Sequence, residues 1–314
     1  MDDEDGKHLA ETLRVLGEAE AWAARTSADA ARMRPAPGSS LRGDDDQAFP
    51  YALSHAVWDA LDHAVDHLTC LQALLRDAKV IHRFAPYALV RGALENACAA
   101  VWMLEPPRRV DRLARRFRLA IDDVRNGEQA RQLTGQQGPR TRKDRLDDIA
   151  AIAARAGLEE EALKNRVSYT EIVKAVDASG APGSLIEFSW KICSGLTHGD
   201  SWAAWSASRM TQMPSPVQDG VATLKMEANL SLLMQMTTLA VRLTGRGWQL
   251  HDQRCQSPYL SSATAQATRC VSSGSIYHGG RRAGYGCGPA RVVLAARRAR
   301  INADVRRRGL CRGL

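Results

Sequence analysis

The 314-residue sequence predicts an all-α fold, a multi-helix bundle followed by a disordered basic tail. Two observations support this. Apolar residues recur at helical spacing through most of the chain up to about residue 250, and no segment has the alternation typical of a strand. The stretch 84–104, FAPYALVRGALENACAAVWML, is apolar or small at nearly every position, so it needs other helices around it. We therefore expect it to be the central helix of the bundle.

The first part of the chain predicts two helices separated by a connector. Residues 8–33 carry leucines and alanines near helical spacing, which favours a helix. Residues 34–47, RPAPGSSLRGDDDQ, contain two Pro, two Gly and three consecutive Asp, which is typical of a mobile connector. The next helix is expected over residues 48–80.

Proline ends the central helix. In Glu105-Pro106-Pro107 the residue before each proline avoids the helical region, so a turn follows. The next helix carries an arginine-rich face at 108–118, which we interpret either as a solvated face or as a surface that faces phosphate. Helices are expected over residues 108–134, 143–156, 158–165, 169–176, 185–198 and 221–250, with a Trp-rich turn or helix after Gly199 and a connector at 209–219.

Net charge divides the chain at residue 252. Residues 252–314 contain 12 Arg and 2 Asp, which leaves 31 basic and 33 acidic residues before them. The basic character therefore belongs to the tail, which lacks helical periodicity and is expected to be disordered. We interpret the tail either as the product of GC-rich DNA that is read out of frame or as a basic arm that binds RNA or DNA. Three regions result: residues 1–47, an N-terminal helix and linker; 48–251, a helical bundle domain; and 252–314, the tail.

Several classes of protein are disfavoured by what the sequence lacks. It contains no GxxxxGK[ST] motif, no GxGxxG after a strand and no GxSxG, which argues against common nucleoside-triphosphatases and hydrolases. The start, MDDEDGK, is acidic and does not resemble an export signal, and no apolar run reaches about 18 residues. We therefore expect a cytoplasmic protein with no membrane association and no cofactor.

Two charged residues interrupt the central apolar helix. Arg91 and Glu95 are four residues apart, which places them on one face. A cation and an anion in such a helix form an internal ion pair or line a polar site, and the spacing alone leaves both interpretations open. His198, in SGLTHGD, is a further candidate because Gly199 permits a sharp end to its helix.

A metal site is a weaker alternative. His63 and His67 are four residues apart, so their imidazoles could share one metal ion, with Glu95 or His198 as a further ligand. The sequence lacks an HExxH motif and the repeated ExxH of di-iron bundles. Packing and hydrogen bonding of the two histidines is the preferred interpretation.

Three short motifs, AVDHL, RGALE and SGLTHGD, together resemble the helical HEPN superfamily, in an uncharacterised bacterial branch, over about residues 48–250. The resemblance implies a helical bundle. Many HEPN proteins are metal-independent ribonucleases of toxin and phage-defence systems that use an Arg and, four to six residues later, a His, often across a dimer. The matching histidine is His198, and the position with six residues between holds Lys191 instead of Arg. RNA or a nucleotide is the implied partner, and a homodimer the implied assembly.

Two functions are therefore expected. The first is a binding module in a toxin, defence or stress-related setting. The alternative is a metal-independent endoribonuclease in which His198 transfers a proton and Arg91 or Lys191 stabilises charge on phosphate. In that mechanism Glu95 orients Arg91, and His67 is a second acid or base if it faces the same interior.

Overall fold

The central helix of the bundle is α5 (Ala85–Leu104). It is apolar because it is covered on nearly all sides, and every residue from Ala97 to Leu104 is buried. In this computed structural model, which describes residues 3–27, 34–136, 138–180, 185–214 and 223–258, the all-α prediction is confirmed.

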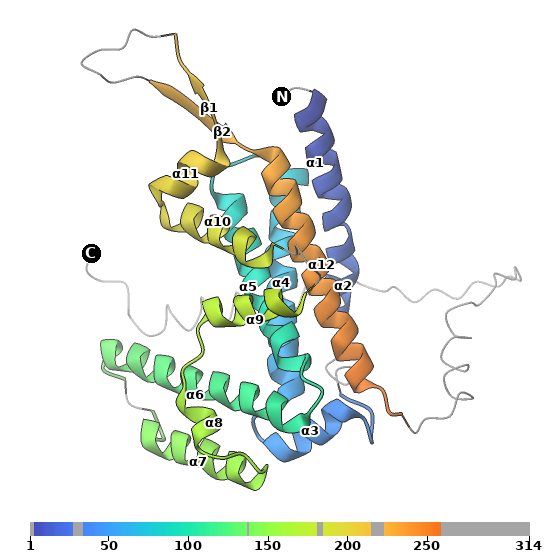
Figure 1. Ribbon diagram of the computed structural model, residues 1–314, viewed down its shortest axis with the longest axis vertical. Helices are drawn as coiled ribbons and strands as arrows, with labels where there is room; N and C mark the ends of the chain where they lie inside the picture. The colour runs from blue at the N-terminus through green and yellow to red at the C-terminus, as the bar shows by residue number, and fades with distance from the viewer. Residues whose placement is uncertain (1–2, 28–33, 137, 181–184, 215–222, 259–314) are drawn as a thin grey trace, which may run out of the picture. The chain divides into compact units, whose positions relative to one another are not determined.

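Four helices pack around α5 and form the main core with it (Figure 1). The most extensive packing against α5 is made by α4 (Leu53–Arg76) and α12 (Leu230–Cys255), which run beside it. The shorter helices α9 (Tyr169–Ser179) and α10 (Ile186–His198) cover another side. The core therefore places α10 alongside the part of α5 that carries Arg91 and Glu95.

A second, smaller apolar cluster is formed by the helices that follow α5, drawn in the lower part of Figure 1. Its long helix is α6 (Arg109–Thr134), which packs against α7 (Arg142–Arg155) and the short α8 (Glu161–Lys164). Thr141 and Asp144 form a capping box that fixes the start of α7. These helices confirm the three that the sequence predicts in this region.

Arginines from two helices close the carboxyl end of α5. Arg115 of α6 donates to the carbonyl oxygen of Trp102, and its guanidinium lies over the indole ring. Arg254 of α12 donates to the carbonyl oxygen of Leu104 over 2.6 Å. The last carbonyls of a helix have no partner inside it, so these bonds satisfy them. For Arg115 neither sequence interpretation holds, because it binds backbone rather than solvent or phosphate.

The predicted connector at 34–47 contains a helix, α3 (Ser40–Ala48), so the prediction is wrong there. Ser39 caps it by accepting a hydrogen bond from the backbone N–H of Arg42. Asp44 is fully buried and accepts two hydrogen bonds of 2.8 Å from the guanidinium of Arg112, which is also buried. The three aspartates are thus not all exposed, since one neutralises an interior arginine.

The N-terminal segment forms two helices, α1 (Asp3–Leu16) and α2 (Glu18–Thr26), instead of one over residues 8–33. The break falls at Gly17, and residues 28–33 lie outside the described part. Both helices belong to the bundle, since α1 packs along α12 and α2 against α4.

An arginine ties α2 to α12. Arg25 forms an ion pair with Asp252 and lies over the ring of Trp248, 4.1 Å from its centroid. Because α12 continues to Cys255, it extends past the predicted start of the tail at 252. The rest of the predicted tail, from residue 259, lies outside the described residues.

A short hairpin departs from the sequence prediction. The Trp-rich segment is the helix α11 (Ser201–Ala207), and it leads into strand β1 (Ser208–Gln212). Strand β2 (Leu224–Ala228) pairs antiparallel with β1, in a region where the sequence predicts a connector and the start of a helix. The strands pair only with each other and are largely exposed, so their sequences show no alternation of apolar and polar residues.

Within the described part of the chain, no helix is long and apolar enough to cross a bilayer.

Candidate functional site

Arg91 and Glu95 form an ion pair on the surface of α5 that faces α10. Arg91 Nε donates to Glu95 Oε1 over 2.8 Å, as their four-residue spacing allows. Their side chains are 23% and 15% exposed, so the pair is mostly covered and reaches solvent over a small part of its surface. Arg91 Nη2 makes no hydrogen bond to another described residue, which leaves part of the guanidinium edge open to a ligand.

His198 completes the site from the last turn of α10. Gly199 follows with a φ of 78°, a left-handed conformation that ends the helix directly after the histidine. Arg91 Nη1 lies 3.1 Å from His198 Nε2, and the imidazole is otherwise exposed. A guanidinium has only donors, so Nε2 is the acceptor and the ring proton is on Nδ1 while this bond exists.

Trp190 is the site residue that the sequence analysis missed. Its indole Nε1 donates to the same oxygen of Glu95 over 2.8 Å, and the ring is 8% exposed. Glu95 is thus held from two sides and can hold Arg91 in one orientation. The sequence feature that could have indicated Trp190 is its place directly before Lys191, on the same helix as His198.

Lys191 does not join this group. Its side chain is exposed on α10 and makes no hydrogen bond or ion pair with any residue that the structure describes. It is seven residues before His198, which places both on one face of α10, about 10 Å apart along the axis at 1.5 Å per residue. Lys191 can therefore attract an anion toward the site without contacting Arg91 or Glu95.

His67 lies against α5 beside the site. Its ring occupies the space where a Cβ atom of Gly92 would be, since that atom would lie 2.3 Å from Nε2. Gly92 directly follows Arg91, but successive residues of a helix point in different directions, and His67 makes no hydrogen bond to Arg91 or His198. The ring is half-buried.

His63 faces a different hollow. Its Nδ1 lies 2.7 Å from the backbone oxygen of Asp59, one turn earlier on α4. Together with Asp59, Arg116 and Asp123 it lines a pocket of about 340 Å³ between α4, α5 and α6. In the described ranges, no three His, Cys, Asp or Glu side chains are grouped so that they could hold a metal ion. The structure therefore places no third ligand, such as Glu95 or His198, with His63 and His67 among the described residues.

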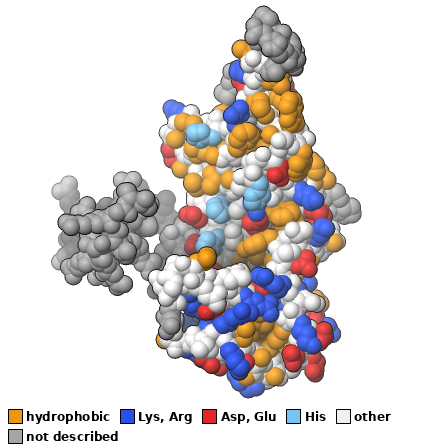
Figure 2. All heavy atoms as spheres, turned by 90° about the vertical axis from the view of Figure 1, so that its left-hand side faces the viewer, with side chains coloured by type: hydrophobic (Ala, Val, Ile, Leu, Met, Phe, Trp, Pro, Cys, Tyr) orange, Lys and Arg blue, Asp and Glu red, His pale blue; other side chains and the backbone are white. Residues whose placement is uncertain are grey.

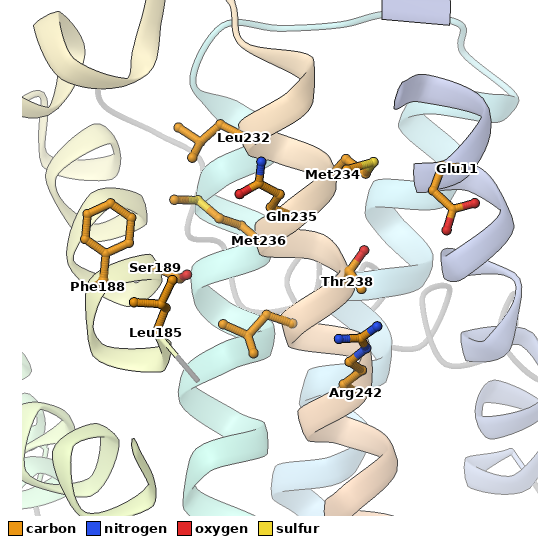
Figure 3. Close-up of a pocket in the computed structure, with 11 residues that line it drawn as sticks. Glu11, Leu185, Phe188, Ser189, Leu232, Met234, Gln235, Met236, Thr238 and Arg242 are labelled. Carbon is orange, nitrogen blue, oxygen red and sulfur yellow. The ribbon is translucent and has the colours of Figure 1, made fainter. Parts of the chain in front are cut away.

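Another hollow lies between α10 and α12, about 400 Å³ in volume (Figure 3). Leu232 and Met236 point from α12 toward Phe188 on α10, while Glu11 of α1 lies on the other side of α12. Its lining is mostly apolar and includes none of the predicted site residues. Phe188 stands at its edge and is 53% exposed.

The group formed by Arg91, Glu95, Trp190 and His198 suits phosphate esters. A guanidinium fork matches phosphate oxygens, and a neutral imidazole beside it can accept a proton. Figure 2 shows several histidines along the middle of the face that lies on the left in Figure 1, where α10 and α11 are.

Comparison with protein-family models, curated proteins and solved structures finds no match to this chain. The resemblance to HEPN proteins thus remains a prediction.

Proposed function

We propose that the protein cleaves RNA without a metal ion, with Arg91 and His198 as the residues that act on the phosphodiester. The supporting observation is the 3.1 Å contact between Arg91 Nη1 and His198 Nε2, at the rim of a bundle where both groups can reach a ligand. It joins a permanent cation to a proton acceptor, the two functions that transfer at phosphorus requires.

The reaction begins when a phosphate of the RNA binds Arg91. The phosphate oxygens take the donors that His198 shared, which frees the Nε2 lone pair. His198 Nε2 then accepts the proton of the adjacent ribose 2′-OH, and O2′ attacks phosphorus. The P–O5′ bond breaks and the leaving oxygen takes up a proton from the imidazolium or from water. The products are a 2′,3′-cyclic phosphate and a 5′-OH end.

Glu95 and Trp190 are positioning residues in this proposal. Arg91 has a long side chain that loses rotamer freedom when it is held, and the bond to Glu95 holds it before the substrate arrives. The bond from Trp190 keeps the carboxylate from rotating away. Lys191 contributes charge near the site and no contact with the reacting atoms.

The test is cleavage of a 5′-labelled unstructured RNA by the full chain, with and without chelator. Cleavage that chelator does not change, that yields cyclic phosphate ends and that leaves the matching DNA intact supports the proposal, because DNA lacks the 2′-OH nucleophile. His198→Ala and Arg91→Gln must abolish it. His63→Ala is the matched control, since this exposed histidine lies outside the site. Cleavage that survives His198→Ala refutes the proposal.

A non-catalytic module that binds RNA or a nucleotide in a toxin, defence or stress-related setting is the second candidate. It is favoured by the network itself: Arg91 is already bonded to Glu95 and His198, as in a cluster that joins α5 to α10. In that case the protein binds labelled RNA without shortening it, and Arg91→Gln lowers the melting temperature along with the affinity. Host growth is then unaffected by expression of the protein.

A further inference from the structure

Beyond the polar site, one side of α10 carries three exposed side chains, with the buried Gly195 among them. Phe188, Lys191, Gly195 and His198 follow each other at intervals of three, four and three residues, so they lie along one side of the helix. Phe188 is 53% exposed, and Lys191 and His198 are exposed. An aromatic ring, a cation and the site histidine thus share one face.

The neighbouring helix adds an indole ring to this face. The Trp202 ring of α11 lies directly on Gly195, where an added Cβ atom would be 2.9 Å from the ring atom Cζ2. Only glycine allows this close approach. Trp202 remains 51% exposed, between the levels of Lys191 and His198 on α10.

A second exposed tryptophan extends the surface. Trp205 is 59% exposed and lies three residues after Trp202, on the same side of α11. Tryptophan is largely buried in most folded proteins, so two half-exposed indoles on a seven-residue helix require an explanation. Their packing does not provide one, because much of each ring lies in solvent.

We propose that Phe188, Trp202 and Trp205 form a stacking track on which unpaired bases of single-stranded RNA lie as the strand enters the Arg91–His198 site. This rests on the proposed function and names its substrate class. Aromatic rings that alternate with cations are the pattern of single-strand binding, because every base has a face that can stack. A duplex keeps its bases stacked inside and cannot use such rings.

A lysine beside three exposed aromatic rings favours RNA over a protein as the occupant. Lys191 lies along α10 between Phe188 and Gly195, on which the Trp202 ring packs, so a phosphate that meets its ammonium group has an aromatic ring on either side for the adjacent bases. The cores of protein interfaces are depleted in lysine, whereas single-strand grooves contain it. The track is also continuous with His198, the residue that is proposed to act on phosphate.

The experiment measures binding with cleavage removed. Full-length His198→Ala protein is titrated into a 5′-labelled single-stranded RNA, and the affinity is read from fluorescence anisotropy. Trp202→Ala in this background is expected to weaken binding roughly tenfold, from a stacking contribution of about 1–3 kcal/mol per base. Trp202→Tyr restores most of it, because a smaller ring still stacks. Phe188→Ala has a similar effect, and duplex RNA of the same sequence binds more weakly.

Leu133→Ala is the matched control, since Leu133 is 89% exposed and lies on α6, far along the chain from the track. Circular dichroism confirms that each variant is folded. Equal affinity of Trp202→Ala and its parent overturns the inference, and so does a dimer in sedimentation that Trp202→Ala dissociates, because the face is then a protein interface. If RNA binds through the track but is never cut, the inference stands and the ribonuclease proposal fails.

Discussion

Replacing Asp44 with alanine removes the partner of a buried arginine. The guanidinium of Arg112 has five N–H donors, and all five are used: two bind Asp44, one binds Ser40 Oγ and two bind the carbonyl oxygens of Pro106 and Pro107. Asp44 is 0% and Arg112 2% exposed. The substitution therefore leaves a charge in the interior with two donors unsatisfied.

The expected loss of stability is about 3–5 kcal/mol, the cost of breaking a buried pair on one side. That is a large share of the roughly 5–15 kcal/mol that stabilises a folded domain. It corresponds to a melting temperature lower by roughly 10 °C. Adding Arg112→Met to Asp44→Ala should recover most of this loss, since no unpaired charge then remains in the interior. Arg109, the other arginine bonded to Asp44, is 42% exposed and is solvated when the carboxylate is removed.

Urea denaturation followed by circular dichroism measures these differences. Asp46→Ala is the control on the same helix, because Asp46 forms an exposed pair with Arg42 and its removal should cost about 0–1 kcal/mol. A loss below about 1 kcal/mol for Asp44→Ala, or a double variant no more stable than the single one, would refute the reasoning.

Three further predictions concern the site and the pH dependence of the fold. Gly92→Ala should displace the His67 ring, because the new Cβ would lie 2.3 Å from Nε2; a shift of the His67 imidazole signals in NMR is expected, and unchanged signals would contradict the contact, whereas stability should change little because alanine favours the helix by about 1 kcal/mol. Burial acts to raise the pKa of Asp252, but hydrogen bonds from a histidine and an arginine outweigh it and lower the pKa to about 2. Since this lies below the unfolded value of about 3.9, Asp252 stabilises the protein above about pH 4, and the contribution is lost as the pH falls through 2. Acid denaturation of Asp252→Asn should show a weaker pH dependence between pH 4 and 2, and an unchanged curve would count against it. Trp190→Phe keeps the apolar ring but removes the donor to Glu95, so the initial rate of RNA cleavage should fall roughly tenfold, from about 1.5 kcal/mol; an unchanged rate would show that this bond does not position the site.

Local patterns were sufficient for most of the helices and for half of the site. The spacing of Arg91 and Glu95 predicts their contact, because it depends only on helix geometry. His198 is different, since its distance from Arg91 depends on how α10 packs on α5. The resemblance to HEPN proteins indicated this histidine, and helical periodicity alone could not. The chemical roles of all three residues remain predictions.

The features that the sequence did not reveal depend on partners far along the chain. Trp190 is a site residue because of a carboxylate 95 residues earlier. Asp44 is in a polar run that is typical of a linker, and only Arg112, 68 residues later, makes it an interior residue. The β1–β2 hairpin has no buried face, so its sequence shows no alternation of apolar and polar residues that would predict the strands. In each case the deciding interaction is outside the window of any local pattern.

The carbonyl contacts at the carboxyl end of α5 have a mechanical consequence. Arg115 and Arg254 bond that end of α5 to two different helices, α6 and α12, so its position in the bundle is fixed from both. α10 is packed against α5 as well, because its residues Ile192, Cys193 and Leu196 are buried in the main core. A ligand that separates Arg91 from His198 is therefore expected to turn the exposed His198 side chain rather than to move either helix.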